Sequence, residues 1–195
     1  MNPTLLVDDR FYHVLACIDS DLAATARRVG CARCSGVLHS ARFRRKPRGT
    51  PAGHRGDDRR ASFCCAVCRK RVTPPSVRFL GRRIYLGAVV VLAAALQQGS
   101  NRWRAHRLRE LFGVSLQTLA RWRVWWQEAF VESGFWKAAK AAFSPAVAEA
   151  LAPGSLLERF GGDELERLAA LLRFLAPLSV PAEYAPDRRR RGNLR

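Results

Sequence analysis

The chain has 195 residues, enough for one medium domain or two small ones. Its unusual property is charge, because 34 Lys and Arg stand against 16 Asp and Glu and leave a formal net charge of +18. This excess predicts a polyanionic partner, and nucleic acid comes before an anionic membrane surface. The longest apolar run, Leu86 to Leu96, is shorter than the ~20 residues of a membrane-spanning helix, which argues against a membrane protein. Early acids at Asp8 and Asp9 do not fit a signal peptide, so we expect a cytoplasmic protein with reduced cysteines.

The first 30 residues predict two short helices. Apolar residues recur at helical spacing on one face of the first helix, Asp9 to Asp19: Phe11, Val14, Leu15 and Ile18. Ser20 is expected to cap a second helix, Asp21 to Val29, which Gly30 would end. Cys17 lies within the first helix, where a single cysteine is expected to belong to the core.

Two CxxC pairs follow, Cys31-Ala-Arg-Cys34 and Cys65-Ala-Val-Cys68. Each pair places two thiolates on one tight turn, and two such turns form the four-thiolate shell that zinc has in structural sites. The gap between the pairs is long, but a long loop costs little extra closure entropy. The sequence therefore predicts a zinc ribbon with these four cysteines as ligands.

The second ligand pair has an alternative, because Cys64 and Cys68 could also form a pair. The CxxC spacing favours Cys65, which also shares a strand face with Phe63 while Cys64 points to the other face. His39 and His54 are nitrogen donors in the same region, and both are expected to be solvated loop residues.

Short strands are expected around the cysteines: Val37 to Phe43, Ser62 to Cys65, and Arg69 to Val72. Pro74 and Pro75 would end the last strand. The segment Arg44 to Ala61 is rich in Arg, Gly, Pro and Asp with almost nothing apolar, which predicts a mobile basic loop. Arg78 to Arg83 is expected to be a basic connector.

A helix from about Tyr85 to Gln98 is apolar on nearly all sides, so it should be the buried central helix of a second unit. Beyond it, one helix starts near Asn101 and ends at Gly113, and a second begins after the N-cap Ser115. Two helices joined by Gly-Val-Ser are typical of a helix-turn-helix motif. By periodicity, the core side of the second helix, which extends to Phe130, holds Leu116, Leu119, Trp122, Trp126 and Phe130.

The outer face of this second helix would enter the major groove of duplex DNA. The residues expected to contact bases are Ser115, Gln117, Thr118 and Arg121. Further candidates for phosphate contacts are Arg102, Arg104, Arg107 and Arg123. An ordinary helical hairpin is the alternative, and its tryptophans would also be buried. The net charge and the zinc ribbon favour DNA binding.

Three further helices are expected: Phe135 to Phe143, Pro145 to Leu151, and Asp163 to Leu175. The last has an apolar stripe of Leu165, Leu168, Ala169, Leu172 and Leu175. This stripe would close the core or pair two subunits, so a homodimer through the C-terminal helices is possible on this pattern. The basic end, Arg188 to Arg195, is expected to be a disordered auxiliary contact to phosphate.

The order of ribbon, Pro-Pro connector, apolar helix and Gly-Val-Ser motif resembles the N-terminal DNA-binding region of bacterial insertion-sequence transposases. The resemblance covers roughly Gly30 to Trp126 and is greatest to the stand-alone, transposase-like proteins. It implies a zinc ribbon and a helix-turn-helix that recognise transposon ends or another specific duplex. Arg109 departs from the pattern, since many such motifs have a small residue four positions before the turn glycine.

We therefore expect a mainly α protein with a small β zinc ribbon inserted after an N-terminal helical segment and followed by a helix-turn-helix domain. The expected units are an N-terminal segment (1–30), the ribbon (31–76), the helix-turn-helix domain (77–131), C-terminal helices (132–182) and a tail (183–195). The expected function is duplex DNA recognition as a transposase-related accessory or regulatory factor. An RNA-binding zinc-ribbon module is the alternative, since an Arg-rich loop also suits structured RNA. Catalysis is not expected, because no carboxylate set for two metals is recognised after Phe130.

Overall fold

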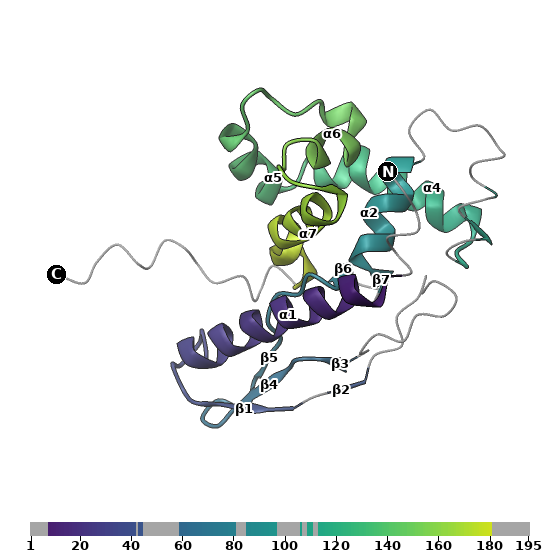
Figure 1. Ribbon diagram of the computed structural model, residues 1–195. Helices are drawn as coiled ribbons and strands as arrows, with labels where there is room; N and C mark the ends of the chain where they lie inside the picture. Colours follow the sequence, from purple (N-terminus) through teal and green to yellow (C-terminus); the bar gives the residue numbers. More distant parts are fainter. Residues whose placement is uncertain are drawn as a thin grey trace.

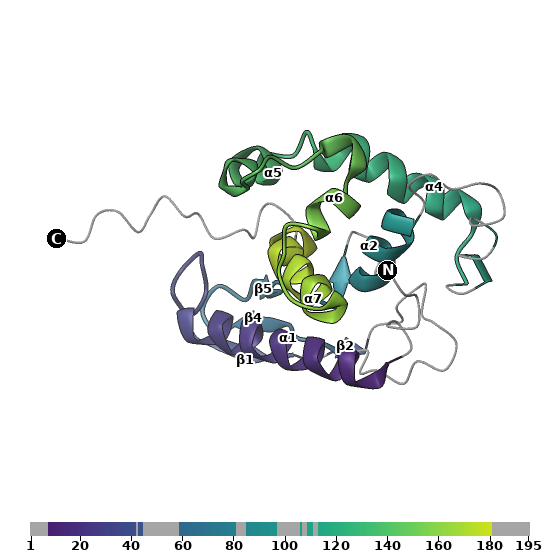
Figure 2. The same ribbon diagram turned by 45° about the horizontal axis from the view of Figure 1, so that its top comes forward.

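The computed structural model describes residues 8–41, 43–44, 59–80, 85–96, 106, 109–110 and 113–180. Within these residues the protein is mainly helical, with a small antiparallel sheet and a cluster of four cysteines, as the sequence predicts. In Figure 1 the long helix α1 (Asp9–Val29) lies between the strands of the cysteine-bearing sheet and a group of helices that includes α7 (Glu164–Leu175). Figure 2 gives a second view, in which α1 runs alongside the strands of this sheet.

Helix α1 is one continuous helix, so the predicted break at Ser20 is wrong. Asp8 caps it by accepting a hydrogen bond from the backbone N–H of Arg10, and it ends at Gly30, whose φ of +83° suits a glycine. Ser20, the predicted cap, is an exposed residue inside this helix, and the carboxylate of its neighbour Asp19 is buried and bonded to residues far along the chain.

The apolar face of α1 is narrower than predicted. Phe11, Leu15 and Ile18 are buried, but Val14 is 46% exposed. Cys17 is also exposed, so its expected place in the core is wrong. The helix turns by about 100° per residue, which places Val14 at the edge of the buried stripe and Cys17 on the opposite side of the helix.

The sheet beside the cysteines has three antiparallel strands in the order β1-β4-β5. Their bounds are Leu38–Ser40 for β1, Phe63–Cys65 for β4 and Arg71–Val72 for β5. Two shorter strands, β2 (Phe43–Arg44) and β3 (Arg59–Arg60), pair with each other at the outer end. The expected strand from Val37 to Phe43 is therefore two separate strands, and most of the predicted basic loop lies outside the described residues.

The segment from Arg78 was predicted to be a basic connector, and the structure shows that its first residues are not. Arg78 is buried, and the two residues after it form β6 (Phe79–Leu80), which pairs with β7 (Tyr85–Leu86). Helix α2 (Gly87–Leu96) follows directly, and residues 88–94 are all buried, which confirms a buried central helix. It begins two residues later than predicted, because Tyr85 and Leu86 form a strand, and the predicted end at Gln98 lies outside the described residues. A helix this apolar on every side needs packing partners all around it, and it is in contact with β6, β7, α4, α6 and α7.

Helix α4 (Leu116–Val124) continues as the π-helix η2 (Trp125–Phe130). Leu119, Trp122, Trp126 and Phe130 are buried as predicted, whereas Leu116 is exposed at the first turn. In an α-helix, residues i and i+4 are offset by about 40° around the helix axis, so a long series of such residues leaves one face. A π-helix has more residues per turn and offsets them in the other direction, which keeps Trp126 and Phe130 on the core side.

The C-terminal part packs onto α2 through short helices. They are α5 (Gly134–Ala139), the 3₁₀ turns η3 (Lys140–Ala142) and η4 (Glu149–Leu151), α6 (Gly154–Leu157), α7, and the 3₁₀ turn η5 (Ala176–Ser179). The predicted helix from Pro145 to Leu151 is thus only a single turn, and α6 was not predicted. Asp163 and Glu166 form a capping box that starts α7.

The stripe on α7 closes the chain's own core. Leu168, Leu172 and Leu175 are buried, together with Leu171, and Leu165 and Ala169 pack against the same cluster. A homodimer through these helices would have to use other side chains, and it stays a prediction.

The described residues form two hydrophobic cores, and α1 contributes to both. Its first half adds Phe11 and Leu15 to the large helical core, and its second half packs Ala23 and Ala26 against the small core around Cys31 and Cys65. Helix α1 therefore ties the cysteine-bearing ribbon to the helical unit.

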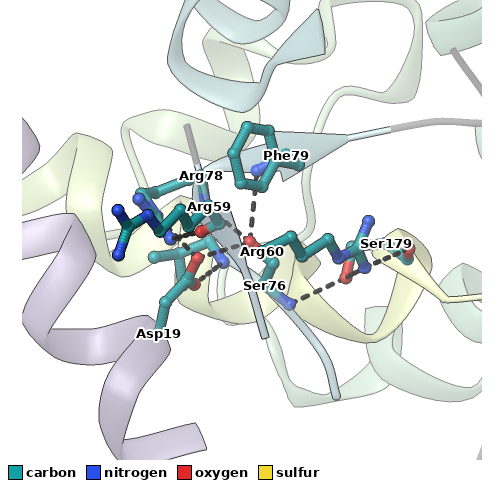
Figure 3. A network of polar contacts seen from close by, with 8 residues as sticks. Asp19, Arg59, Arg60, Ser76, Arg78, Phe79 and Ser179 are labelled. Atoms are coloured by element: carbon teal, nitrogen blue, oxygen red, sulfur yellow. Dashed lines mark hydrogen bonds and ion pairs between the residues drawn. The ribbon is translucent and has the colours of Figure 1, made fainter. Parts of the chain in front are cut away.

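A buried polar network reinforces this junction (Figure 3). The Asp19 carboxylate accepts hydrogen bonds from Ser76 Oγ at 2.6 Å, Val77 N at 2.6 Å and Arg78 Nε at 2.8 Å. Arg78 also donates to the Arg59 carbonyl oxygen at 2.6 Å. On the other side, Ser179 Oγ accepts from the Ser76 backbone N–H, and its carbonyl accepts from Arg60 Nη2 at 2.7 Å. One network thus joins α1, β3, the segment after the Pro-Pro pair and the end of the helical unit.

Candidate metal centre and candidate DNA-binding helix

The four predicted ligands meet at one point. The sulfur atoms of Cys31, Cys34, Cys65 and Cys68 all lie within 4.8 Å of one another. Cys31 Sγ is 3.6 Å from Cys68 Sγ, and Cys34 Sγ is 3.4 Å from Cys65 Sγ. These distances exceed the ~2.05 Å of a disulfide. They are close to the ~3.8 Å edge of a tetrahedron with Zn–S bonds of ~2.3 Å, so the donor set fits one tetrahedral metal ion.

The two CxxC turns have the same backbone geometry. Ser35 N–H donates to the Cys31 carbonyl and Cys31 N–H to the Gly36 carbonyl, at 2.8 and 3.0 Å. In the second turn Arg69 N–H donates to the Cys65 carbonyl and Cys65 N–H to the Lys70 carbonyl, at 3.1 and 3.0 Å.

The residues that follow the two turns share a backbone conformation as well. Ser35 and Arg69 both have a positive φ, of 56° and 58°. The cysteine cluster is therefore built from two copies of one knuckle, whose sulfur atoms meet.

Backbone amides of each knuckle point at its first sulfur. The backbone N–H of Arg33 lowers the pKa of the Cys31 thiol, and that of Cys68 lowers the pKa of Cys65 to about 6. The Lys70 N–H acts in the same direction on Cys68, but burial and the neighbouring thiols outweigh it and raise that pKa to about 11. Four crowded thiols thus resist full ionisation by themselves, and a dication among them would remove that resistance.

Gly36 leaves the space that the second knuckle occupies. A Cβ atom at this position would lie 2.9 Å from Cys65 Sγ and 2.9 Å from Val67 Cγ2. Contacts this short force a neighbour to move, and one of the neighbours is a ligand sulfur. The glycine is therefore part of the metal site although it offers no donor atom.

Cys64 lies outside the cluster, so the predicted choice of Cys65 is the one that the structure has. Cys64 Sγ lies against the carbonyl oxygens of Cys65 and Arg69, at 3.8 and 3.6 Å. Its strand neighbour His39 is exposed, and His54 lies outside the described residues.

The first turns of α4 expose a basic, acid-free surface. Gly113, with φ +58°, and the buried Val114 precede the N-cap Ser115, whose hydroxyl accepts from the Thr118 backbone N–H at 3.2 Å. Gln117 and Arg121 are exposed one turn apart. No acid occurs within α4, so this face keeps its positive charge.

Thr118 does not lie on the outer face, contrary to the prediction. Its side chain is 7% exposed, and its hydroxyl accepts a hydrogen bond from Arg121 Nη2 at 2.9 Å. Thr118 therefore orients Arg121 rather than facing a ligand. Ser115 is exposed but its hydroxyl is engaged in the cap.

The other predicted arginines are described only in part. Arg123 is exposed on α4, whereas Arg102, Arg104 and Arg107 lie outside the described residues. Before the turn, His106, Arg109 and Glu110 are helical, and the Arg109 carbonyl accepts from the Gly113 N–H at 2.9 Å. Arg109 is exposed, so its size does not obstruct a buried contact.

Sequence reasoning missed the polar residues between the ribbon and the helical unit. Sequence reasoning placed Arg60 in the basic loop, Arg78 in the connector and Asp19 at the end of the first helix, yet all three are buried. The nearest signal was the segment Val77 to Leu80, where an arginine stands among apolar residues.

None of the helices in the described part of the chain is long and apolar enough to cross a membrane. Comparison of the chain with protein-family models, with curated proteins and with solved structures finds no match. The functional argument therefore rests on the cysteine cluster and on the exposed face of α4.

Proposed function

We propose that the protein is a zinc-stabilised, duplex DNA-binding protein in which the helix α4 reads bases in the major groove. The observation that carries the proposal is the exposed, acid-free start of α4, where Gln117 and Arg121 stand free of the core behind a glycine turn. Gln suits adenine and Arg suits guanine at base edges in the major groove.

The metal is proposed to be zinc. Four thiolates in a closed, tetrahedral arrangement are the ligands of structural zinc sites, and iron is the other common metal in such a set. Cys31 and Cys65 are buried, so the cluster leaves little room for the open position that a catalytic metal needs. The expected role of the ion is to hold the two knuckles and the sheet together.

The geometry around Arg121 supports base contact over a purely structural role. Its guanidinium is exposed and is held from one side by Thr118 Oγ1. A guanidinium fixed in this way loses less conformational freedom when it binds a base edge. Arg123 lies on the same acid-free helix and is proposed to contact phosphate.

Selection of duplexes from a random pool by the zinc-loaded full chain tests the DNA proposal. We expect an enriched site, and binding that weakens steeply with salt. Arg121→Ala should relax preference at one base pair, with about 1–3 kcal/mol of discrimination lost. Arg173→Ala is the matched control, because Arg173 is an exposed arginine on α7.

A second variant separates orientation from charge. Thr118→Val keeps a buried side chain of similar size and removes the hydroxyl that holds Arg121. It should reduce base preference less than Arg121→Ala does. Enrichment of no duplex, or tighter binding to folded RNA in a direct competition, would refute the proposal, and the second result would favour the RNA-binding alternative.

Metal analysis of the purified protein tests the proposal that the four cysteines bind zinc. We expect about one zinc per chain and, after exchange, a cobalt spectrum of tetrahedral thiolate type. Iron in place of zinc, or no metal in protein purified without chelators, would contradict it.

A further inference from the structure

We propose that the groove between the second half of α1 and the ribbon sheet binds a phosphate of a nucleic-acid backbone, at a site separate from α4. This inference rests on the proposed function in one respect, that the phosphate belongs to a nucleic acid. The groove has a volume of about 490 Å³. Its polar lining residues are Ser20, Arg27 and Arg28 of α1 and Ser40 and Ser62 of the ribbon.

The charge of the groove suits an anion. Arg27 and Arg28 are both exposed, and none of the residues that line the groove is acidic. Arg28 Nη2 donates only a long hydrogen bond of 3.4 Å to Thr25 Oγ1. Guanidinium groups offer several N–H donors in a planar arrangement that matches phosphate. Two adjacent arginines beside three serine hydroxyls therefore form a set of donors without a competing carboxylate.

The buried hydroxyl of Ser62 is a second observation that points to a ligand in the groove. The residue is 2% exposed, and in the described part of the chain its hydroxyl has no hydrogen-bond partner. Its backbone is engaged, because its carbonyl accepts from the Ala41 N–H at 2.8 Å. A buried hydroxyl without a partner is unfavourable. Because Ser62 lines the groove, rotation about its χ1 bond would present this hydroxyl to a phosphate oxygen there.

The shape of the region favours a strand over a free ion. A volume of about 490 Å³ lies in the range of sites for small ligands, which is too small for a duplex but sufficient for part of one strand. A second recess of about 110 Å³ adjoins it and shares Ser20, Ala23 and Ala61. That recess is lined by the ion pair of Asp19 and Arg78 as well as by the exposed Arg59, so the acid-free part of the region is the larger groove.

A charge-matched pair of double variants tests the proposal in the zinc-loaded full chain. Arg27→Gln with Arg28→Gln removes the groove arginines, and Arg10→Gln with Arg173→Gln removes two exposed arginines elsewhere. Binding to a labelled single-stranded oligonucleotide and to a duplex is measured over a range of salt concentrations. The groove variant should bind about tenfold more weakly than the control variant, with a salt slope lower by about 1 to 2. Equal losses in the two variants would overturn the proposal.

Ser62→Ala provides a test without a change of charge. It removes a hydroxyl that has no partner, so the protein should remain as stable to urea as wild type or become more stable. Nucleic-acid binding should nevertheless weaken about threefold to tenfold. Wild-type binding by Ser62→Ala would count against the groove.

The outcomes separate this inference from the proposed function. If Arg121→Ala relaxes base preference while groove and control variants bind alike, only the groove proposal fails. If wild-type protein binds no oligonucleotide, both fail. Inorganic phosphate serves as a further probe: stabilisation by phosphate that the groove variant loses, without any difference in oligonucleotide binding, would assign the groove to a free anion and overturn the backbone proposal.

Discussion

Replacement of Asp19 should lower the free energy of unfolding strongly, although its side chain is small. Its carboxylate accepts three hydrogen bonds, from Ser76, Val77 and Arg78, and it is 7% exposed. Asp19→Ala would remove the carboxylate that pairs with the Arg78 guanidinium, which is also buried. Removing one member of a buried ion pair costs about 3–5 kcal/mol, against a total stability of about 5–15 kcal/mol for a typical domain.

Urea unfolding of the zinc-loaded protein measures this loss, followed by the fluorescence of the buried Trp126 and Trp136. Asp21→Ala is the matched control, because Asp21 is an exposed acid on the same helix. The free energy of unfolding should fall by about 3–5 kcal/mol in Asp19→Ala and by less than about 0.5 kcal/mol in Asp21→Ala.

A double variant isolates the ion pair itself. Asp19→Leu with Arg78→Met removes both charges, so the loss should be smaller than the sum of the two single losses by about 1–3 kcal/mol. Part of the loss should remain, because Val77 N–H and Ser76 Oγ still lack an acceptor. The reasoning is refuted if Asp19→Ala unfolds at the same urea concentration as Asp21→Ala.

Three further predictions concern the metal site and the helical unit. Cys65→Ser should abolish tight metal binding while Cys64→Ser leaves the zinc content near one per chain; loss of zinc in both would contradict the ligand assignment. Gly36→Ala should weaken metal affinity in a chelator competition by about tenfold or more, since its Cβ would overlap a ligand sulfur, and an unchanged affinity would show that the knuckles can separate freely. The Trp136 Nε1–H and the neighbouring ammonium group of Lys140 lower the pKa of Glu149, so its stabilising effect is complete above the unfolded pKa and is lost as the pH falls through the folded value. The stability difference between wild type and Glu149→Gln should therefore be larger at about pH 6 than at about pH 3, and a difference independent of pH would be inconsistent with this ionisation.

Several features could be predicted because they depend on local spacing. Two CxxC turns define their sulfur pairs within four residues, and strand alternation was enough to choose Cys65 over Cys64. The apolar run of α2 had to be buried somewhere, and Asp163 marks the start of α7 through its capping box.

Other predictions were wrong where a residue's partner lies far away in the chain. Ser20 followed by Asp21 resembles a helix start, but Ser20 lies inside α1, and the neighbouring Asp19 carboxylate is bonded to residues 57 and 58 positions later. Thr118 has the spacing of an outer-face residue, but tertiary packing buries it and leaves its hydroxyl to hold Arg121. The spacing of nearby residues in the sequence does not predict the contacts of either residue.

The sequence by itself determined the four thiol ligands, the buried central helix and the basic character of the chain, since each follows from residue type and near spacing. Only the tertiary structure decided that α1 is one helix shared by two cores, that Arg60 meets the Ser179 carbonyl 119 residues later, and that Arg27, Arg28 and Ser62 line one groove. The reason is physical: burial and hydrogen bonding of a polar group depend on which distant segment packs against it, and that choice is made by the whole core.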